Sequence, residues 1–92
     1  MLISLVEIKK QVDGSYTLET VFVNPKHVSM LREDFTISRE LAEGRVNLPI
    51  NKSAGFTRLT INSDVTKEIT VIGTPSVIET KFFNKRKMLL RG

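Results

Sequence analysis

The 92-residue chain contains no cysteine, no tryptophan and a single histidine, His27. The absence of cysteine excludes disulfide bonds, thiolate metal sites and a cysteine nucleophile. A single histidine excludes metal sites built from several histidines and a catalytic pair with a second orienting imidazole. The five glycines are scattered, and neither of the common phosphate-binding loops occurs. The adjacent acids Glu33 and Asp34 would point to opposite faces of a strand, so they form a poor acid–base pair. We therefore expect a binding protein that uses no cofactor, and not an enzyme.

Long hydrophobic runs are also absent. No apolar segment approaches the roughly 18–20 residues that span a bilayer. The N-terminal stretch "MLISLVEIKKQ" lacks the preceding base and the following small-residue cleavage site of a signal peptide. These features predict a cytoplasmic protein without membrane association. A single domain over residues 1–92 is expected, and so small a core favours association with further copies of the chain.

The basic residues are unevenly distributed. The net charge is +4, yet residues 81–92 hold five bases and no acid, whereas the first eighty residues hold nine bases and ten acids. The excess therefore belongs to the C-terminal segment, of which residues 85–92 are interpreted as a basic tail. Such a run is commonly a solvated end, and contact with a polyanion is the functional alternative.

The clearest local signal is a β-hairpin formed by residues 2–12 and 15–24 around Asp13-Gly14, a pair that suits a tight turn. Its second arm has two partly apolar faces, Tyr16, Leu18, Thr20 and Phe22 on one side and Thr17, Glu19, Val21 and Val23 on the other. We expect this arm to lie between other layers. The first arm also has the spacing of a short helix, so both alternatives stay open there.

Asn24-Pro25 ends the second arm, and an apolar rhythm resumes at once over residues 27–34. The short gap predicts that this next strand pairs antiparallel with the preceding one. Residues 35–54 are interpreted as an irregular loop insertion. Within them Ser38 could cap a single helical turn that ends at Gly44, and an extended loop is the alternative.

A second hairpin, "GFTRLTIN" and "KEITVIG" joined by "SDVT", alternates with period two. Thr74 and Pro75 then suit the start of a helix of about ten residues, with a capping box at Ser76-x-x-Glu79. Val77, Ile78 and Phe82 would form its apolar stripe. The sum is a mainly β fold of about five antiparallel strands, bent like a small barrel, with one short C-terminal helix.

Polar side chains at the turns carry the binding chemistry, since amide, ammonium and imidazole groups suit phosphates and base edges. The candidate nucleic-acid-binding residues are Asn24, Lys26, His27, Lys52, Arg58, Lys85, Arg86 and Lys87, and Lys67 lies on the second hairpin. For His27 the structural alternative is an ordinary histidine of a surface turn. Phe82 and Phe83 could stack on nucleobases, and the alternative is that they are core residues of the helix.

The succession "VFVNPKHVSMLRED", a variable loop, "FTRLTIN" and "EITVIGTPSVIETK" resembles a group of small uncharacterised proteins from cyanophages and marine metagenomic samples. The similarity covers residues 3 to 90. It implies an Sm-like fold, which is a strongly bent five-stranded barrel related to SH3-like barrels, with subunits that join edge to edge in a ring. It also implies contact with single-stranded RNA or DNA through loops at one rim, here "NPKH" and "NSDVT". The compartment would then be the host cytoplasm.

The usual Sm signatures are missing, because Asp-x-x-x-Asn has no match near "NPKHVSMLRED" and Arg-Gly occurs only as Arg91-Gly92. The uridine pocket of Sm proteins is therefore not carried over. Two hypotheses follow. The first is a non-enzymatic homo-oligomeric ring that binds single-stranded RNA or DNA during its processing. The second is an adaptor that binds another protein through sheet edges or the tail, where Met88, Leu89 and Leu90 could fill a groove or pair as a strand.

Overall fold

The computed structural model describes residues 1–44 and 54–91, and for residues 84–91 it describes the backbone alone. The elements in chain order are β1 (Ile3–Lys10), β2 (Tyr16–Val23), the 3-10 helix η1 (Pro25–His27), β3 (Val28–Glu33), α1 (Phe35–Ala42), β4 (Phe56–Asn62), β5 (Thr66–Ile72) and α2 (Pro75–Arg91). The five strands form one antiparallel sheet of order β2-β1-β5-β4-β3. The predicted mainly β class, with five antiparallel strands and a C-terminal helix, is confirmed.

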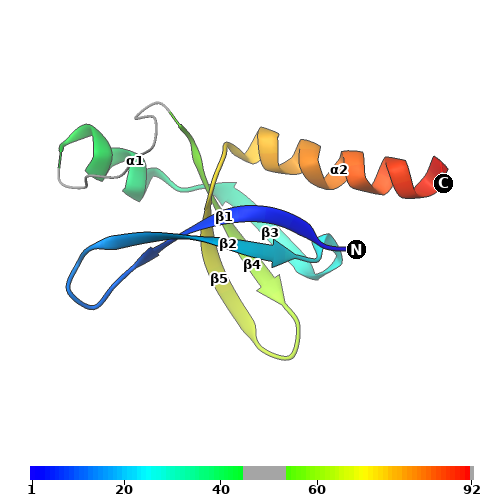
Figure 1. Cartoon of the computed structure of the whole chain (residues 1–92), viewed down its shortest axis with the longest axis horizontal. Coiled ribbons are helices and arrows are strands. Elements are labelled where there is room, and N and C mark those ends of the chain that lie inside the picture. The colour runs from blue at the N-terminus through cyan, green and yellow to red at the C-terminus, as the bar shows by residue number, and fades with distance from the viewer. Residues whose placement is uncertain (45–53, 92) are drawn as a thin grey trace.

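The two hairpins of this sheet meet at a very short ladder. β1 pairs with β2 along all of its eight residues, but it pairs with β5 only at Glu7↔Val71 and Ile8↔Thr70. A ladder this short lets the strands on either side diverge as the sheet twists. The β1–β2 hairpin accordingly runs across the β4–β5 hairpin (Figure 1).

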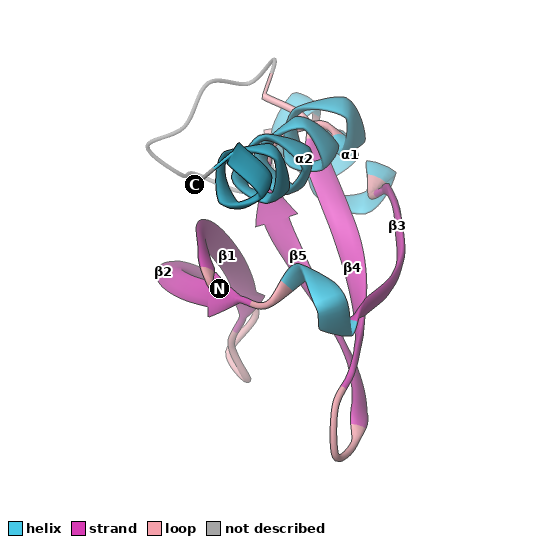
Figure 2. Cartoon of the chain, turned by 90° about the vertical axis from the view of Figure 1, so that its right-hand side faces the viewer, coloured by secondary structure: helices cyan, strands magenta, loops and turns pink. Residues whose placement is uncertain are grey.

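The sheet is curled but not closed, because its edge strands β2 and β3 do not pair with each other. In a flat sheet four inter-strand steps of about 4.8 Å would hold these edges roughly 19 Å apart. They are joined only by Asn24 and the three residues of η1, and a 3-10 turn rises about 2 Å per residue. The sheet must therefore curl, and α2 and η1 lie across its open side (Figure 2).

The prediction that the strand after Asn24-Pro25 pairs with the preceding arm is wrong, because β3 pairs with β4 at the opposite edge. The Asn24 side chain accepts a hydrogen bond from the Lys26 N–H (3.0 Å), and the His27 N–H donates to the Asn24 carbonyl (2.9 Å). This compact turn carries the chain across the open side instead of reversing it into a hairpin. The first arm, for which strand and helix were both open, is the strand β1.

Two core clusters lie on opposite faces of the sheet. The larger consists of Ile3, Leu5, Val23, Leu59, Ile69, Val71, Ile78 and Phe82. The smaller consists of Ile8, Ile37, Leu41 and Phe56. Val21 packs against the larger cluster, whereas Tyr16 and Leu18 pack against the smaller one. The expectation that this arm lies between two full layers is therefore wrong. β2 is an edge strand with two partly apolar faces, because one end is covered on one face and the other end on the opposite face.

Helix α1 begins at Phe35, earlier than the single turn predicted from Ser38. The difference arises because Asp34 is the N-cap and its carboxylate accepts a hydrogen bond from the Thr36 N–H (3.0 Å). Gly44, with φ +74°, follows the end of the helix as predicted. The predicted loop insertion over 35–54 therefore contains a helix, and its residues 45–53 lie outside the described part of the chain.

The α1 helix is tied to the first hairpin by one side-chain hydrogen bond. The Tyr16 hydroxyl donates to Glu40 Oε2 (2.6 Å). Burial, reinforced by the hydrogen bond and by the negative charge of Glu40, raises the pKa of Tyr16 to about 12. The phenol therefore stays protonated, and remains a donor to Glu40, throughout the neutral range.

Helix α2 starts as predicted but is longer. Thr74 Oγ1 accepts a hydrogen bond from the Val77 N–H (3.3 Å), so Thr74 is the cap and the Ser76-x-x-Glu79 box is not needed. The helix spans 17 residues. Ile78 and Phe82 are buried and Val77 is exposed. Residues 85–91 of the predicted basic tail are helical, so the alternative of a strand at "MLL" is wrong.

The Asp34 carboxylate connects α1, β4 and β5. Besides capping α1, it accepts hydrogen bonds from Thr70 Oγ1 (2.9 Å) and Arg58 Nη2 (3.2 Å). Burial alone would raise the pKa of Asp34, but the hydrogen bonds from Thr70, the Thr36 N–H and Arg58, together with the Arg58 charge, outweigh burial and hold the pKa below its ordinary value. The folded state therefore favours the ionised carboxylate.

Asp34→Ala should lower the free energy of unfolding at pH 7 by about 2–3 kcal/mol, because it removes a cap and two charge-assisted hydrogen bonds. Glu68→Ala is the control, since it removes only a 3.8 Å contact to Arg58 at the surface, and it should cost less than about 0.5 kcal/mol. Because the folded pKa of Asp34 is lowered, its contribution is complete above the ordinary value of 3.8 and is lost as the pH falls below it. Urea titrations at pH 7 and at pH 3 measure both effects, and equal losses in the two variants would contradict this role.

Candidate nucleic-acid interface

A hollow of about 290 Å³ opens between the β1–β2 and β4–β5 hairpins, beside η1. Its apolar wall is the end of the larger core cluster and consists of Val21, Val23, Ile61 and Ile69. The remaining lining residues are Leu2, Glu7, Phe22, Asn24, His27 and Lys67. We call this site the η1 hollow. It combines an apolar floor with an aromatic ring, an amide, an imidazole, an ammonium group and a carboxylate.

The η1 turn positions two of these groups. Buried Pro25 anchors the turn, and the Asn24 amide oxygen is occupied by the Lys26 N–H. The Asn24 side-chain NH₂ therefore remains as the donor that a ligand could meet. His27 follows at the end of the turn, where its side chain is exposed and lines the hollow.

Phe22 and Lys67 approach the hollow from two different hairpins. The Phe22 side chain is 63% exposed although it is aromatic, because it lies on the face of β2 opposite to Val21 and Val23, beyond the part of that face that the smaller core cluster covers. Lys67 is exposed on β5, and it forms no ion pair with any acid that the structure describes. Lys67 thus brings a free positive charge to the hollow, and Phe22 lies at its rim, on the face of β2 opposite to Val21 and Val23.

Glu7 is the most unusual residue of the hollow. It lies on the same face of β1 as the core residues Ile3 and Leu5, it is only 9% exposed, and it has no hydrogen bond or ion pair within the described part of the chain. In the β1–β2 register it lies directly opposite Glu19. The residue is buried as a whole, but its carboxylate oxygens still reach solvent, since no described side-chain oxygen is both buried and without a partner. Like charges opposite each other are destabilising. The Glu7 carboxylate is therefore locally unfavourable and unused by the fold.

The predicted site residues do not all come together. Asn24 and His27 line the η1 hollow, and Lys26 is exposed on the same turn without lining it. Arg58 lies on the opposite face of β4, where it contacts Asp34 and Glu68 (3.8 Å). Lys52 lies outside the described residues. Lys85, Arg86 and Lys87 belong to α2, in the part whose side chains the structure does not describe.

Glu7 and Phe22 line the hollow without being among the residues predicted from the sequence. The alternation Ile3, Leu5, Glu7 contains the signal, because it places an acid on the inward face of a strand. That signal could be used only if residues 2–9 were assigned to a strand, and the helical alternative was still open. The alternation of β2 puts Phe22 on the Tyr16 face, and no local pattern indicates that this face is uncovered at the end of the strand.

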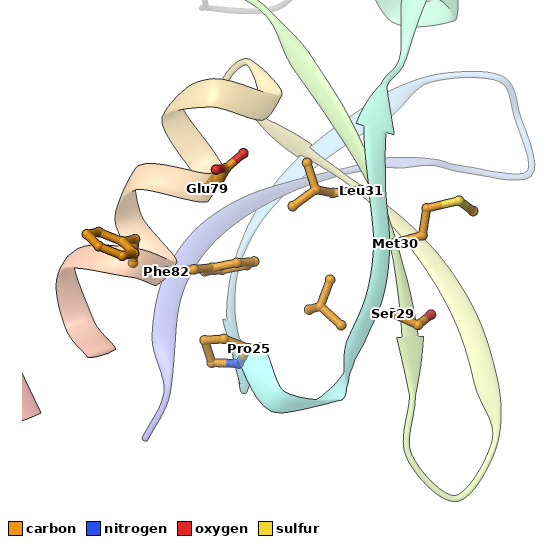
Figure 3. A pocket seen from close by; sticks show the side chains of 8 residues that line it. Pro25, Ser29, Met30, Leu31, Glu79 and Phe82 are labelled. Atoms are coloured by element: carbon orange, nitrogen blue, oxygen red, sulfur yellow. The ribbon is translucent and has the colours of Figure 1, made fainter. Parts of the chain in front are cut away.

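A second hollow, of about 360 Å³, lies between β3 and α2. Figure 3 shows the Phe82 ring pointing into it, between Pro25 and Leu31. Exposed Met30 and Phe83 also line it. Since β3 is an edge strand, this groove, which Ser29 and Glu79 line together with apolar residues, lies beside unpaired backbone groups.

A scan against family models gives no match, and searches of curated proteins and of solved structures give none either. The resemblance to the phage and metagenomic group therefore stays a prediction. None of the helices that the structure describes is long and apolar enough to cross a membrane. Among the described side chains, no three or more His, Cys, Asp or Glu are grouped so that they could hold a metal ion.

Glu7→Gln should raise the free energy of unfolding by about 0.2–1 kcal/mol, because it keeps the side-chain shape and removes a like charge directly opposite Glu19. Glu19→Gln is the matched control. It relieves the same repulsion but also breaks the Lys9–Glu19 ion pair (3.4 Å), so we expect a change of less than about 0.5 kcal/mol. Urea denaturation at pH 7 measures both variants. A destabilised Glu7→Gln variant would show that the fold uses the carboxylate.

Proposed function

We propose that this protein is a non-enzymatic module that binds single-stranded nucleic acid, RNA before DNA, in the η1 hollow. The observation that carries the proposal is the convergence of Phe22, His27 and Lys67 on one hollow with an apolar floor. An exposed aromatic ring is a stacking platform for a base, and ammonium and imidazole groups beside it suit phosphate and base-edge contacts.

The size of the hollow favours a single strand. Ligand pockets commonly measure about 300–1,000 Å³, so a hollow of about 290 Å³ is suited to one base and not to a duplex. A base can enter such a site only when it is unstacked, and unstacked bases are a property of single strands, loops and bulges. A ligand of this kind explains why Phe22 is left uncovered.

Charge supports the same class of ligand. The net charge is +4, and exposed Lys26 adjoins His27 on the η1 turn. The basic residues of α2 add to the positive field, which attracts a polyanion and raises its rate of association at low salt. Neutralising phosphates releases counterions, so the affinity should fall steeply as salt rises.

The proposal includes a homo-oligomeric ring. The sheet has two unpaired edges, β2 and β3, and pairing β2 of one copy with β3 of the next would use both. Such a head-to-tail contact makes a ring when the rotation between copies closes. A ring would repeat one weak site per copy along a strand, which raises the overall affinity by multivalency. The ring would act in RNA or DNA processing in the cytoplasm.

Phe22→Ala should weaken binding of a fluorescein-labelled single-stranded 12-nucleotide RNA by about tenfold in fluorescence anisotropy, because one base loses its stacking partner. Phe35→Ala is the matched control. Phe35 is 61% exposed, close to the 63% of Phe22, but it lies on α1 outside the hollow, so this change should leave the affinity within about twofold. Light scattering of the wild type, with and without the RNA, measures the molar mass and so the number of copies in the oligomer.

Wild-type protein that shows no salt-sensitive binding of RNA or DNA would contradict the proposal. Equal losses in the two phenylalanine variants would place the interface elsewhere. A monomer in light scattering, with and without the oligonucleotide, would contradict the ring and leave the binding site standing.

The second candidate is an adaptor that binds an extended segment of another protein. The groove between β3 and α2 favours it, because an added strand could pair with the β3 edge and place an apolar side chain in the groove. Exposed Met30 and Phe83 would be covered by such a partner.

Deleting residues 85–92 separates the two candidates. The truncated chain should still fold, because the buried helical residues Ile78 and Phe82 precede the deletion. On the first proposal the variant forms the same oligomer in light scattering. It binds RNA several-fold more weakly, since it loses four basic residues. Loss of the oligomer or of a protein partner, with RNA binding intact, would favour the adaptor.

A further inference from the structure

The Glu7 carboxylate suggests which base the η1 hollow takes, and this inference rests on the proposed binding of single strands. Glu7 is nine-tenths buried, lines the hollow and has no hydrogen-bond or ion-pair partner among the described residues. Every other polar group in the hollow is a donor or lies at its exposed rim. We propose that the η1 hollow selects guanine, with Glu7 accepting hydrogen bonds from the N1–H and N2–H groups of the base.

The donor and acceptor patterns of the four bases decide this choice. Guanine carries two neighbouring N–H donors on its Watson–Crick edge, and a carboxylate carries two acceptor oxygens that can meet them side by side. Uracil and thymine carry one N–H between two carbonyl oxygens, and those oxygens would be repelled by the carboxylate. In adenine and cytosine the amino group adjoins a ring nitrogen that is an acceptor, so only one hydrogen bond forms.

The surroundings of Glu7 strengthen this discrimination. Val21 and Ile69 line the same hollow and keep the local dielectric constant low, and there a hydrogen bond to a charged acceptor is stronger than in water. The guanine acceptors O6 and N7 suit donors such as the Asn24 NH₂ and the Lys67 ammonium group. Phe22, 63% exposed, lies at the rim on the other face of β2, where a neighbouring base of the strand can stack.

A cationic side chain of a protein partner would also satisfy a carboxylate. Charge argues against it, because Lys67 lines the hollow without an acidic partner among the described residues and Lys26 is exposed on the adjoining turn. A guanidinium group would meet these charges on its way to Glu7. Guanine is neutral and brings a phosphate that the same lysines attract.

The test uses four labelled RNA octamers that are identical, uridine throughout, except for guanine, adenine, cytosine or uracil at one central position, and a fifth with inosine there. The readout is the ratio of affinities for the guanine and uracil octamers, measured by fluorescence anisotropy within each variant. For the wild type we expect a ratio of about ten or more, since a good bidentate pair discriminates at least about fivefold. Inosine, which lacks the 2-amino group, should lie between guanine and uracil.

Glu7→Gln should reduce the ratio to about one, because a carboxamide offers one acceptor and one donor in place of two acceptors. Glu19→Gln, a change opposite Glu7 in the register but outside the hollow, should keep the ratio of the wild type. Urea denaturation of the same samples confirms that both variants are folded.

The outcomes separate this inference from the function on which it rests. Octamers that all bind equally well to the wild type would overturn the selection of guanine and leave single-strand binding standing. Octamers that do not bind at all would overturn both. A guanine preference that survives in Glu7→Gln would overturn the role of Glu7. Competition by N-acetyl-arginine amide, but not by guanosine monophosphate, would overturn the assignment to a base in favour of a cationic peptide.

Discussion

β1 and β5 pair at two positions, and most of the architecture depends on how short that ladder is. Because it fixes the two hairpins at one point only, they cross instead of continuing as a flat sheet. The crossing separates the apolar surface into two clusters on opposite faces. It also brings the far edges of the sheet near enough for Asn24 and a single 3-10 turn to join them. The open side that remains is covered by α2 and η1.

The η1 hollow is a product of the same geometry. Two crossing hairpins diverge away from their common ladder, and the space between them is filled by core side chains on the α2 side and left open on the other. Glu7 is one of the two β1 residues in the ladder, so the backbone that carries it is held where the two hairpins meet, and its residue lines the hollow. The fold leaves this charge without a described partner, and Phe22 beside it is uncovered. Such violations of local preference are expected where a protein keeps residues for a ligand.

Much of the fold could be predicted from local patterns. Asp13-Gly14 and the alternation around Arg58 determine the two hairpins, and Thr74-Pro75 determines the start of α2. What could not be predicted depends on contacts between distant residues. The partner of β3 follows from the curl of the sheet, which no short segment encodes. Arg58 looked like a free base until the fold placed it 3.2 Å from Asp34, a residue that itself looked like the end of a strand.

The candidate site also depends in part on contacts between residues that are distant in sequence. Asn24 and His27 could be proposed from their turn alone, since the chemistry of an Asn-Pro-Lys-His turn is local. Glu7 and Phe22 acquire their meaning only when the second hairpin lies across the first, because burial and exposure are decided by that crossing.

The short β1–β5 ladder also has a consequence for the order of folding. Each hairpin closes a short loop, so it can form early and independently, whereas the ladder joins residues from near the two ends of the chain and costs more loop-closure entropy. The ladder then belongs to the late steps of folding and is among the first structure to open. A chain with both hairpins formed but not yet crossed would have nearly all of its strands and no η1 hollow. The ability to bind would therefore report completion of the fold more closely than the content of secondary structure does.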